Sequence, residues 1–165
     1  MSSVGVPAPN SGLLSFDAGQ YHTVALAPGG VVVSWGPCSQ GQCFPPEPNR
    51  DFVKLSAGGW HTVGLKADGT IRVWGDNDWG QLEIPEPNGD FIQIAAGYRH
   101  SLALKSDGSI VAWGHNDSGE CNVPLPNTEF VAISAGAGNS FGLKADGSLV
   151  AWGSNHLGRN EPPLV

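Results

Sequence analysis

One unit of 39 residues is written four times along this chain of 165 residues, without a single insertion. Three dipeptides mark its phase: Ala-Gly begins at 18, 57, 96 and 135, Trp-Gly at 35, 74, 113 and 152, and Pro-Asn at 9, 48, 87 and 126. Short repeats bury their apolar faces on their neighbours rather than alone. The pattern therefore predicts a single domain over residues 1–165, with repeats at approximately 10–48, 49–87, 88–126 and 127–165.

Each unit contains four short segments with the pattern of β-strands. In the third unit these segments are residues 91–95, 101–105, 109–113 and 120–124. Leu102 and Leu104 alternate with smaller residues, which is the period of a half-buried strand. Asp107-Gly108 lies between two segments and is typical of a tight hairpin turn. An all-β fold of four-stranded units follows, and units of this length match the blades of a β-propeller.

The composition agrees with this fold and restricts the partners. With 24 glycines and 13 prolines, no long helix can form, while six Trp and six Phe can supply a core. No apolar run approaches the roughly 18 residues that span a bilayer. The formal charge of −7 disfavours nucleic acid and acidic membrane surfaces. The N-terminus has no basic or apolar leader pattern, so a soluble cytoplasmic protein is the default expectation.

Three motifs recur in register over about residues 3–163: A-G-x-x-H-[ST], L-K-x-D-G-[ST]-[IL] and W-G-x-N-x-x-G-[QE]. In these motifs the chain resembles the regulator-of-chromosome-condensation (RCC1-type) repeat. The compact 39-residue form is similar to that of the bacterial propeller-type β-lactamase inhibitor proteins. The resemblance implies a β-propeller, usually of seven blades, that mostly serves as a platform for binding other proteins.

Four blades are too few to close such a ring. Seven blades divide a circle at about 51° each, so four sweep only about 206° and leave two apolar faces open. Eight blades need about 45° each, which is a small change at every interface. We therefore expect two chains to pair as a homodimer and close an eight-bladed ring. A four-bladed monomer and a fragment of a longer propeller remain the alternatives.

Both ends of the chain repeat the fourth segment of the unit. Residues 3–7 and 159–163 both share the phase of residues 81–85, but the C-terminal copy has lost its apolar residues. We expect residues 3–7, through Val4 and Val6, to act as a clasp strand that completes the blade of the last repeat. Deletion of residues 1–9 should then lower the melting temperature sharply.

Residues present in every unit are explained by the scaffold. The four Trp of the Trp-Gly motif are therefore core residues. His22, His61 and His100 share one position with Asn139, which favours a structural hydrogen bond over a proton shuttle or metal ligand.

Positions that differ between units are candidates for binding. The A-G-x-x turns carry Tyr21, Trp60, Tyr98 and Arg99, which are residue types typical of binding hot spots. In the resembled inhibitor proteins, aromatic residues at these positions lie on the partner-binding face. The W-G-x-x-x-x-G loops add further candidates, a Trp outside the repeat pattern and an acidic rim suited to a basic partner: Trp79, Asp76, Asp78 and Asp117.

These features predict a non-catalytic scaffold that binds a protein partner through one propeller face. A carbohydrate-binding propeller is the first alternative, because sugars stack on Trp and Tyr. A purely structural, self-assembling propeller, natural or engineered, is the second. The loops differ from blade to blade, which favours a protein partner over a repeated sugar site.

The sequence gives little support for an enzymatic function. No nucleophile elbow, Walker loop or H-E-x-x-H motif occurs, and His115 has no obvious carboxylate partner. We expect no catalytic residue, metal or cofactor. Three cysteines do not make a complete disulfide framework, so a reduced chain is the default. Cys38 and Cys43 could still bridge a loop, or contribute to a loosely spaced zinc site.

Overall fold

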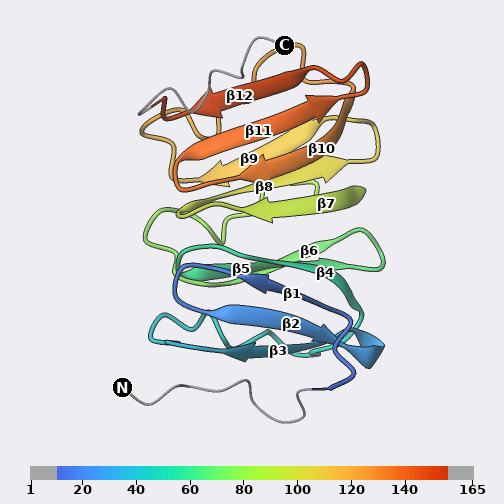
Figure 1. The fold of residues 1–165 in the computed structure, drawn as a ribbon, viewed down its shortest axis with the longest axis vertical. Coiled ribbons are helices and arrows are strands. Elements are labelled where there is room, and N and C mark those ends of the chain that lie inside the picture. Colours follow the sequence, from blue (N-terminus) through green and yellow to red (C-terminus); the bar gives the residue numbers. More distant parts are fainter. Residues whose placement is uncertain (1–10, 156–165) are drawn as a thin grey trace.

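The computed structural model describes residues 11–155, which form four antiparallel sheets of three strands each. The sheets follow one another along the long axis of the molecule (Figure 1). The first contains β1 (Ser15–Ala18), β2 (Thr23–Ala27) and β3 (Val31–Trp35), with the short 3-10 turn η1 (Pro28–Gly30) between β2 and β3. The others contain β4 (Phe52–Ala57), β5 (His61–Lys66) and β6 (Ile71–Gly75); β7 (Phe91–Ala96), β8 (His100–Lys105) and β9 (Ile110–Gly114); and β10 (Phe130–Ala135), β11 (Asn139–Lys144) and β12 (Leu149–Gly153).

Each sheet, together with the loop that follows it, forms one blade. Its three strands run up, down and up in sequence order, and the second strand lies in the middle. The Asp-Gly turns join the second and third strands as expected: Gly108 has a φ of 81°, and Asp107 Oδ1 accepts from the Ser109 amide at 2.9 Å. The all-β propeller blade predicted from the sequence is thus present, with the first three strands of each unit where the pattern predicted them.

The prediction of a fourth strand in each blade is wrong for the described residues. In the third blade the segment 120–124 forms turns instead of joining the sheet. The backbone N–H of Asn122 donates to Gly119 O at 3.0 Å, and the backbone N–H of Val123 donates to Cys121 O at 3.0 Å. Pro124 has no backbone N–H to donate. Because the amides serve local turns, they are not available to a ladder. The proposed clasp at residues 3–7, and its counterpart at 159–163, lie outside the described residues.

The core consists of three interfaces between successive blades. Each blade has a forward face, toward the next blade, and a rear face, toward the preceding one. Between the second and third blades, Val63, Leu65 and Ile71 of the forward face pack against Ile94 and Trp113 of the rear face. Equivalent clusters join the first blade to the second and the third to the fourth. Apolar burial at these interfaces is the main force that holds the blades together.

Three of the four repeated Trp side chains, Trp74, Trp113 and Trp152, cross these interfaces and are buried as predicted, whereas Trp35 of the first blade is only half-buried. Trp74 is 6% exposed, and its indole Nε1 donates to Gln42 O of the first blade at 2.9 Å. Trp113 and Trp152 make the same bond to the residues one repeat later, Gln81 and Glu120. The carbonyl groups of the segment predicted as a strand therefore anchor the next blade.

The repeated His side chains also join neighbouring blades. His61 is buried, and its Nε2 lies 2.9 Å from Ser101 Oγ of the next blade. His22 and His100 are placed alike, against Thr62 and Ser140. The structural role predicted for these residues is confirmed.

The Ala-Gly glycines lie where the blades approach most closely. A Cβ added at Gly58 would lie 2.6 Å from Gly97 O, and one added at Gly97 would lie 2.6 Å from Gly136 O. No larger residue fits there without displacing the neighbouring backbone. Among residues 11–155, no helix is long and apolar enough to cross a membrane.

Candidate binding face

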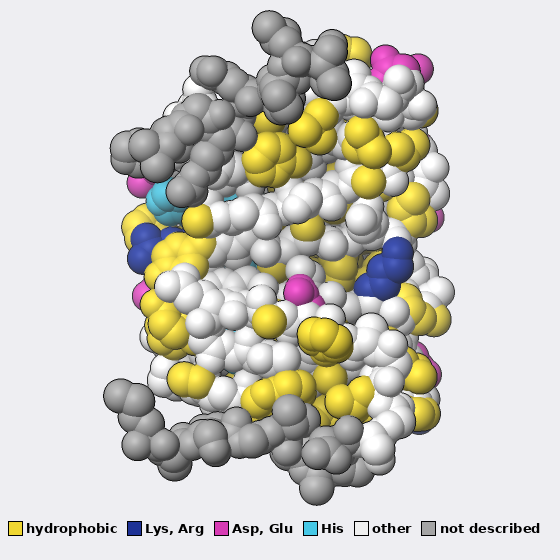
Figure 2. All heavy atoms as spheres, in the orientation of Figure 1, with side chains coloured by type: hydrophobic (Ala, Val, Ile, Leu, Met, Phe, Trp, Pro, Cys, Tyr) yellow, Lys and Arg dark blue, Asp and Glu magenta, His cyan; other side chains and the backbone are white. Residues whose placement is uncertain are grey.

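Two series of loops meet at one edge of the sheets, as far as residue 155, beyond which the fourth W-G-x-x-x-x-G loop lies outside the described residues. The A-G-x-x turns join the first and second strands of each blade, and the W-G-x-x-x-x-G loops follow the third strand. Because the strands are antiparallel, both loops lie at the same end of the sheet. In Figure 2 hydrophobic, basic and histidine side chains gather at the left edge, which is where β8 begins and β9 ends in Figure 1.

Tyr21 and Trp60 form a stack across the boundary between the first two blades. Their ring centroids are 3.8 Å apart and their planes differ by 20°. Gln20 Nε2 donates to the Tyr21 hydroxyl at 3.2 Å. A side-chain hydrogen bond with Tyr98, followed by partial burial, raises the pKa of Tyr21 above its ordinary value. Tyr21 therefore connects the stack to the third blade.

Arg99 lies between two aromatic rings that come from different loops. Its guanidinium carbon is 4.9 Å from the centroid of Trp79 and 5.1 Å from that of Tyr98. Trp79 also meets His115 edge-on, with centroids 4.6 Å apart. Trp79 remains 41% exposed. Arg99 and His115 contact part of its ring, and the rest is accessible to a partner.

The structure thus brings together the five aromatic and basic residues that the sequence proposed separately. We call Tyr21, Trp60, Tyr98, Arg99 and Trp79 the aromatic ridge. Its members come from three blades and from both loop series. Contacts between them fix their side chains, which lowers the entropy that a partner would otherwise have to remove on binding.

The three predicted acidic residues have different surroundings. Asp76 is half-buried and braces its own loop, since its Oδ2 accepts from Gln81 Nε2 at 2.9 Å. Asp78 is exposed. The Asp117 side chain is 82% exposed, and its Oδ2 lies 3.3 Å from His115 Nε2. Asp78 and Asp117 can therefore face a partner, whereas Asp76 already serves the loop.

The expectation that His115 has no carboxylate partner is wrong. Its Nδ1 lies 2.9 Å from Glu120 Oε1, and Glu120 is 3% exposed. Burial alone would raise the pKa of Glu120, but hydrogen bonds from the backbone and from His115 together hold that pKa below its usual value. His115 is thus fixed between two carboxylates and supports the edge of Trp79.

The sequence did not predict the role of the residue that follows the last glycine of each W-G-x-x-x-x-G loop. Gln42, Gln81 and Glu120 are buried, and each bonds to the residue five positions earlier. A signal for this existed, because the change from Gln81 to Glu120 coincides with a change from Asp76 to His115. The two exchanges together preserve a hydrogen bond inside the loop.

Cys38 and Cys43 form a disulfide, so the default of a fully reduced chain is corrected. Their Cα atoms are 5.4 Å apart. One repeat later the same two positions hold Asn77 and Leu82, and Asn77 Oδ1 accepts from the Leu82 amide at 2.9 Å. The disulfide therefore replaces a hydrogen bond that closes the equivalent loop elsewhere.

The remaining cysteine and the metal-binding options are also defined by the structure. Cys121 is a free thiol, and burial, followed by the charge of Glu120, raises its pKa to about 12. It therefore stays protonated and is a poor nucleophile at neutral pH.

Within residues 11–155 no three His, Cys, Asp or Glu side chains are grouped so that they could hold a metal ion.

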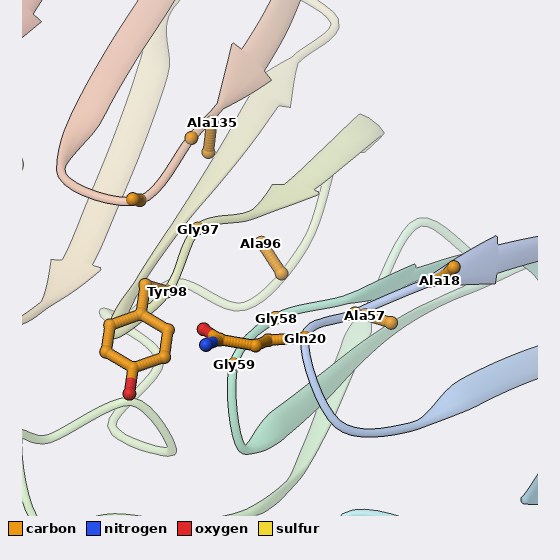
Figure 3. A pocket seen from close by; sticks show the side chains of 12 residues that line it. Ala18, Gln20, Ala57, Gly58, Gly59, Ala96, Gly97, Tyr98 and Ala135 are labelled. Atoms are coloured by element: carbon orange, nitrogen blue, oxygen red, sulfur yellow. The ribbon is translucent and has the colours of Figure 1, made fainter. Parts of the chain in front are cut away.

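A hollow of about 220 Å³ lies where the Ala-Gly turns of the four blades meet. Gly, Ala, Gln20 and Tyr98 line it, and Figure 3 shows the Tyr98 ring and the Gln20 amide beside each other at its rim. Its walls are mostly backbone and small side chains. Its polar groups are mainly backbone amides and carbonyls, and its largest side chain, Tyr98, belongs to the aromatic ridge.

Solved structures share this fold. Prp20p from Saccharomyces cerevisiae superposes with a TM-score of 0.75 and 22% identity, over 91% of this chain and 46% of that chain. The receptor kinase CR4 ectodomain from Physcomitrella patens gives 0.74 and 27%, over 90% and 43%. The computationally designed Ika4 protein gives 0.53 and 17%, over 90% and 95%. The chain thus spans about half the length of Prp20p.

No curated protein sequence matches the chain. The family model of the regulator of chromosome condensation (RCC1) repeat matches residues 52–81, 91–120 and 130–159, which is more than half of the sequence. The matches share the phase of the 39-residue unit and cover the three blades that follow the first. The chain therefore belongs to the RCC1 repeat family.

Proposed function

We propose that this chain is a non-catalytic scaffold that binds a protein partner through the aromatic ridge, with Asp78 and Asp117 at its border. The observation that carries the proposal is the position of Arg99 between Trp79 and Tyr98. Large aromatic and Arg side chains held on loops are the residue types that dominate binding energy in protein interfaces.

The blade itself does not require these residues. At the position of Trp60 the other blades carry Tyr21, Arg99 and Gly138, yet all four sheets have the same strands. The variation therefore supports a role outside the scaffold. Different residues on each blade suit a partner with a different surface at each contact, whereas a repeated sugar site would favour identical residues.

The charge of the border suits a partner with a basic patch. Asp78 directly precedes Trp79 in the chain, Asp117 pairs with the His115 ring that meets Trp79, and the chain has a formal charge of −7. Opposite charge at the rim of an interface mainly speeds association and selects the partner. Binding of the partner should therefore weaken as the salt concentration rises.

A structural relative also binds proteins. The study of Prp20p describes its binding properties to Gsp1p and histones. At 22% identity the likeness shows the fold alone, and it names no partner for this chain.

The test is affinity capture from an extract of the source organism, followed by measurement with the purified partner. The full chain should retain a partner that Trp60→Ala and Arg99→Ala lose or bind at least 10-fold more weakly, since hot-spot losses exceed about 1.4 kcal/mol. Leu125→Ala is the matched control, because Leu125 is 89% exposed and lies near Asn127, at the opposite edge of the blade.

The same variants separate the alternatives. If Trp60→Ala and Arg99→Ala bind the partner as well as the full chain does, the ridge is not the binding face. Retention of glycans on an array, lost with Trp60→Ala, would favour the carbohydrate-binding alternative instead.

A further inference from the structure

The last blade presents an open forward face. Leu143 is 37% exposed and Leu149 is 46% exposed. The residues one repeat earlier, Leu104 and Ile110, are 0% and 3% exposed because the fourth blade covers them. Phe141, Leu143 and Leu149 line an apolar hollow of about 110 Å³ on this face.

The first blade presents the opposite kind of surface, an open rear face. Phe16 is 77% exposed, whereas Ile94 and Ile133, which hold the same position in later blades, are 8% and 7% exposed. Trp35 is only half-buried, while the three later Trp of its series are buried. Exposed apolar residues of this size, grouped on one sheet face, mark a surface that another element covers.

These two open faces are the two halves of an interface that the chain builds three times internally. Leu143 and Leu149 hold the positions of Leu65 and Ile71, which pack on the rear face of the third blade. Phe16 and Trp35 hold the positions of Ile94 and Trp113 on that rear face. Apolar forward positions therefore meet apolar rear positions of the same series.

A backbone hydrogen bond crosses each interface, and the two open faces carry its donor position and its acceptor position. The Gln20 amide donates to Gly58 O at 3.3 Å, Gly59 to Gly97 O at 3.3 Å and Tyr98 to Gly136 O at 3.1 Å. Ala137 holds the donor position on the open forward face, and Gly19 holds the acceptor position on the open rear face. A second copy placed one blade further on would continue the same series of bonds.

We propose that two copies of this chain pair head to tail and close an eight-bladed ring. The forward face of each fourth blade covers the rear face of the other copy's first blade, and two-fold symmetry satisfies both interfaces at once. Blades set at about 51° in a seven-bladed ring need a change of only about 6° at each interface to close with eight. The ring then presents the aromatic ridge twice, on one side.

The experiment is the solution mass of the full chain, measured by light scattering and sedimentation over a wide range of concentration. The expected mass is twice 17.1 kDa, without growth at high concentration. Leu149→Asp on the forward face and Phe16→Asp on the rear face should each yield monomers. Leu125→Asp, at a residue 89% exposed on the far edge, is the control and should remain a dimer.

Mixing the two variants tests the head-to-tail arrangement. Each variant keeps one intact face, so the mixture should form a heterodimer through one native interface, although neither variant pairs alone. Circular dichroism confirms that each variant is folded. A folded wild-type monomer at every concentration would overturn the proposal, since further blades would then have to fill both faces. Masses that keep growing, or a mixture that does not pair, would also overturn it.

Discussion

The imidazole of His61 shares a hydrogen bond with the hydroxyl group of Ser101 in the next blade, with 2.9 Å between Nε2 and Oγ. In the equivalent pair of His22 and Thr62, the hydroxyl also donates to Gln42 O at 2.9 Å. The hydroxyl proton is thus committed to the carbonyl group, so the imidazole must donate from Nε2. Burial lowers the pKa of His22, His61 and His100 to about 4, so at neutral pH each imidazole is neutral and links two blades.

The stability of the protein should fall as the pH is lowered from about 6.5 toward 4. Burial lowers the pKa of His22, His61 and His100 to about 4, whereas in the unfolded chain the ordinary value is near 6.5. Between these values the unfolded state binds more protons, so acid favours unfolding. Chemical denaturation at a series of pH values measures the effect.

His61→Asn provides the control for this titration, since Asn139 already fills the equivalent position in the fourth blade. The variant should fold and show a shallower loss of stability over the same pH range. An unchanged slope would show that His61 does not contribute to it.

Asn88→Ala should destabilise the protein by about 2 kcal/mol, because it removes two hydrogen bonds worth about 1 kcal/mol each. Asn88 Oδ1 accepts from the Ile71 amide at 2.8 Å, and its Nδ2 donates to Ile71 O at 3.0 Å. Arg72→Ala, at an exposed residue of the same strand, is the control and should change the free energy of unfolding little. Equal effects from the two changes in urea unfolding would contradict this role.

Reduction of the Cys38–Cys43 disulfide should lower the melting temperature modestly. A cross-link that closes so short a loop contributes about 2 kcal/mol in the chain-entropy model. The double change Cys38→Asn with Cys43→Leu restores the pairing seen between Asn77 and Leu82. Its melting temperature should lie between those of the oxidised protein and a Cys38→Ser, Cys43→Ser control. If the two double variants melt together, the hydrogen bond does not substitute for the disulfide.

Tyr98→Phe should return the pKa of Tyr21 toward its ordinary value. The chain has only two Tyr residues, so the variant leaves a single phenol to follow by ultraviolet absorbance. The hydrogen bond with Tyr98 is the largest cause of the raised pKa of Tyr21. A Tyr21 titration that stays above the ordinary range in Tyr98→Phe would show that the two phenols are not linked.

Much of the scaffold could be predicted from the sequence because its signals recur. Trp74, Trp113 and Trp152 were assigned to the core from their spacing alone, and all are buried. The occurrence of Asn139 in the histidine series predicted a structural hydrogen bond, which the other three positions show. The fourth strand failed because alternation of apolar residues cannot show that the amides of Asn122 and Val123 are engaged in turns.

The repeat length, the first three strands of each unit and the residues of the scaffold were determined by the sequence itself, because with a period of 39 residues each position can be compared with three others in the same environment. Only the tertiary structure decided which loop residues meet. Tyr21 stacks on Trp60, and Arg99 lies between Trp79 and Tyr98, across blades and across two loop series. Those contacts depend on the angle between blades and on side-chain rotamers, and no periodic pattern in the chain records either.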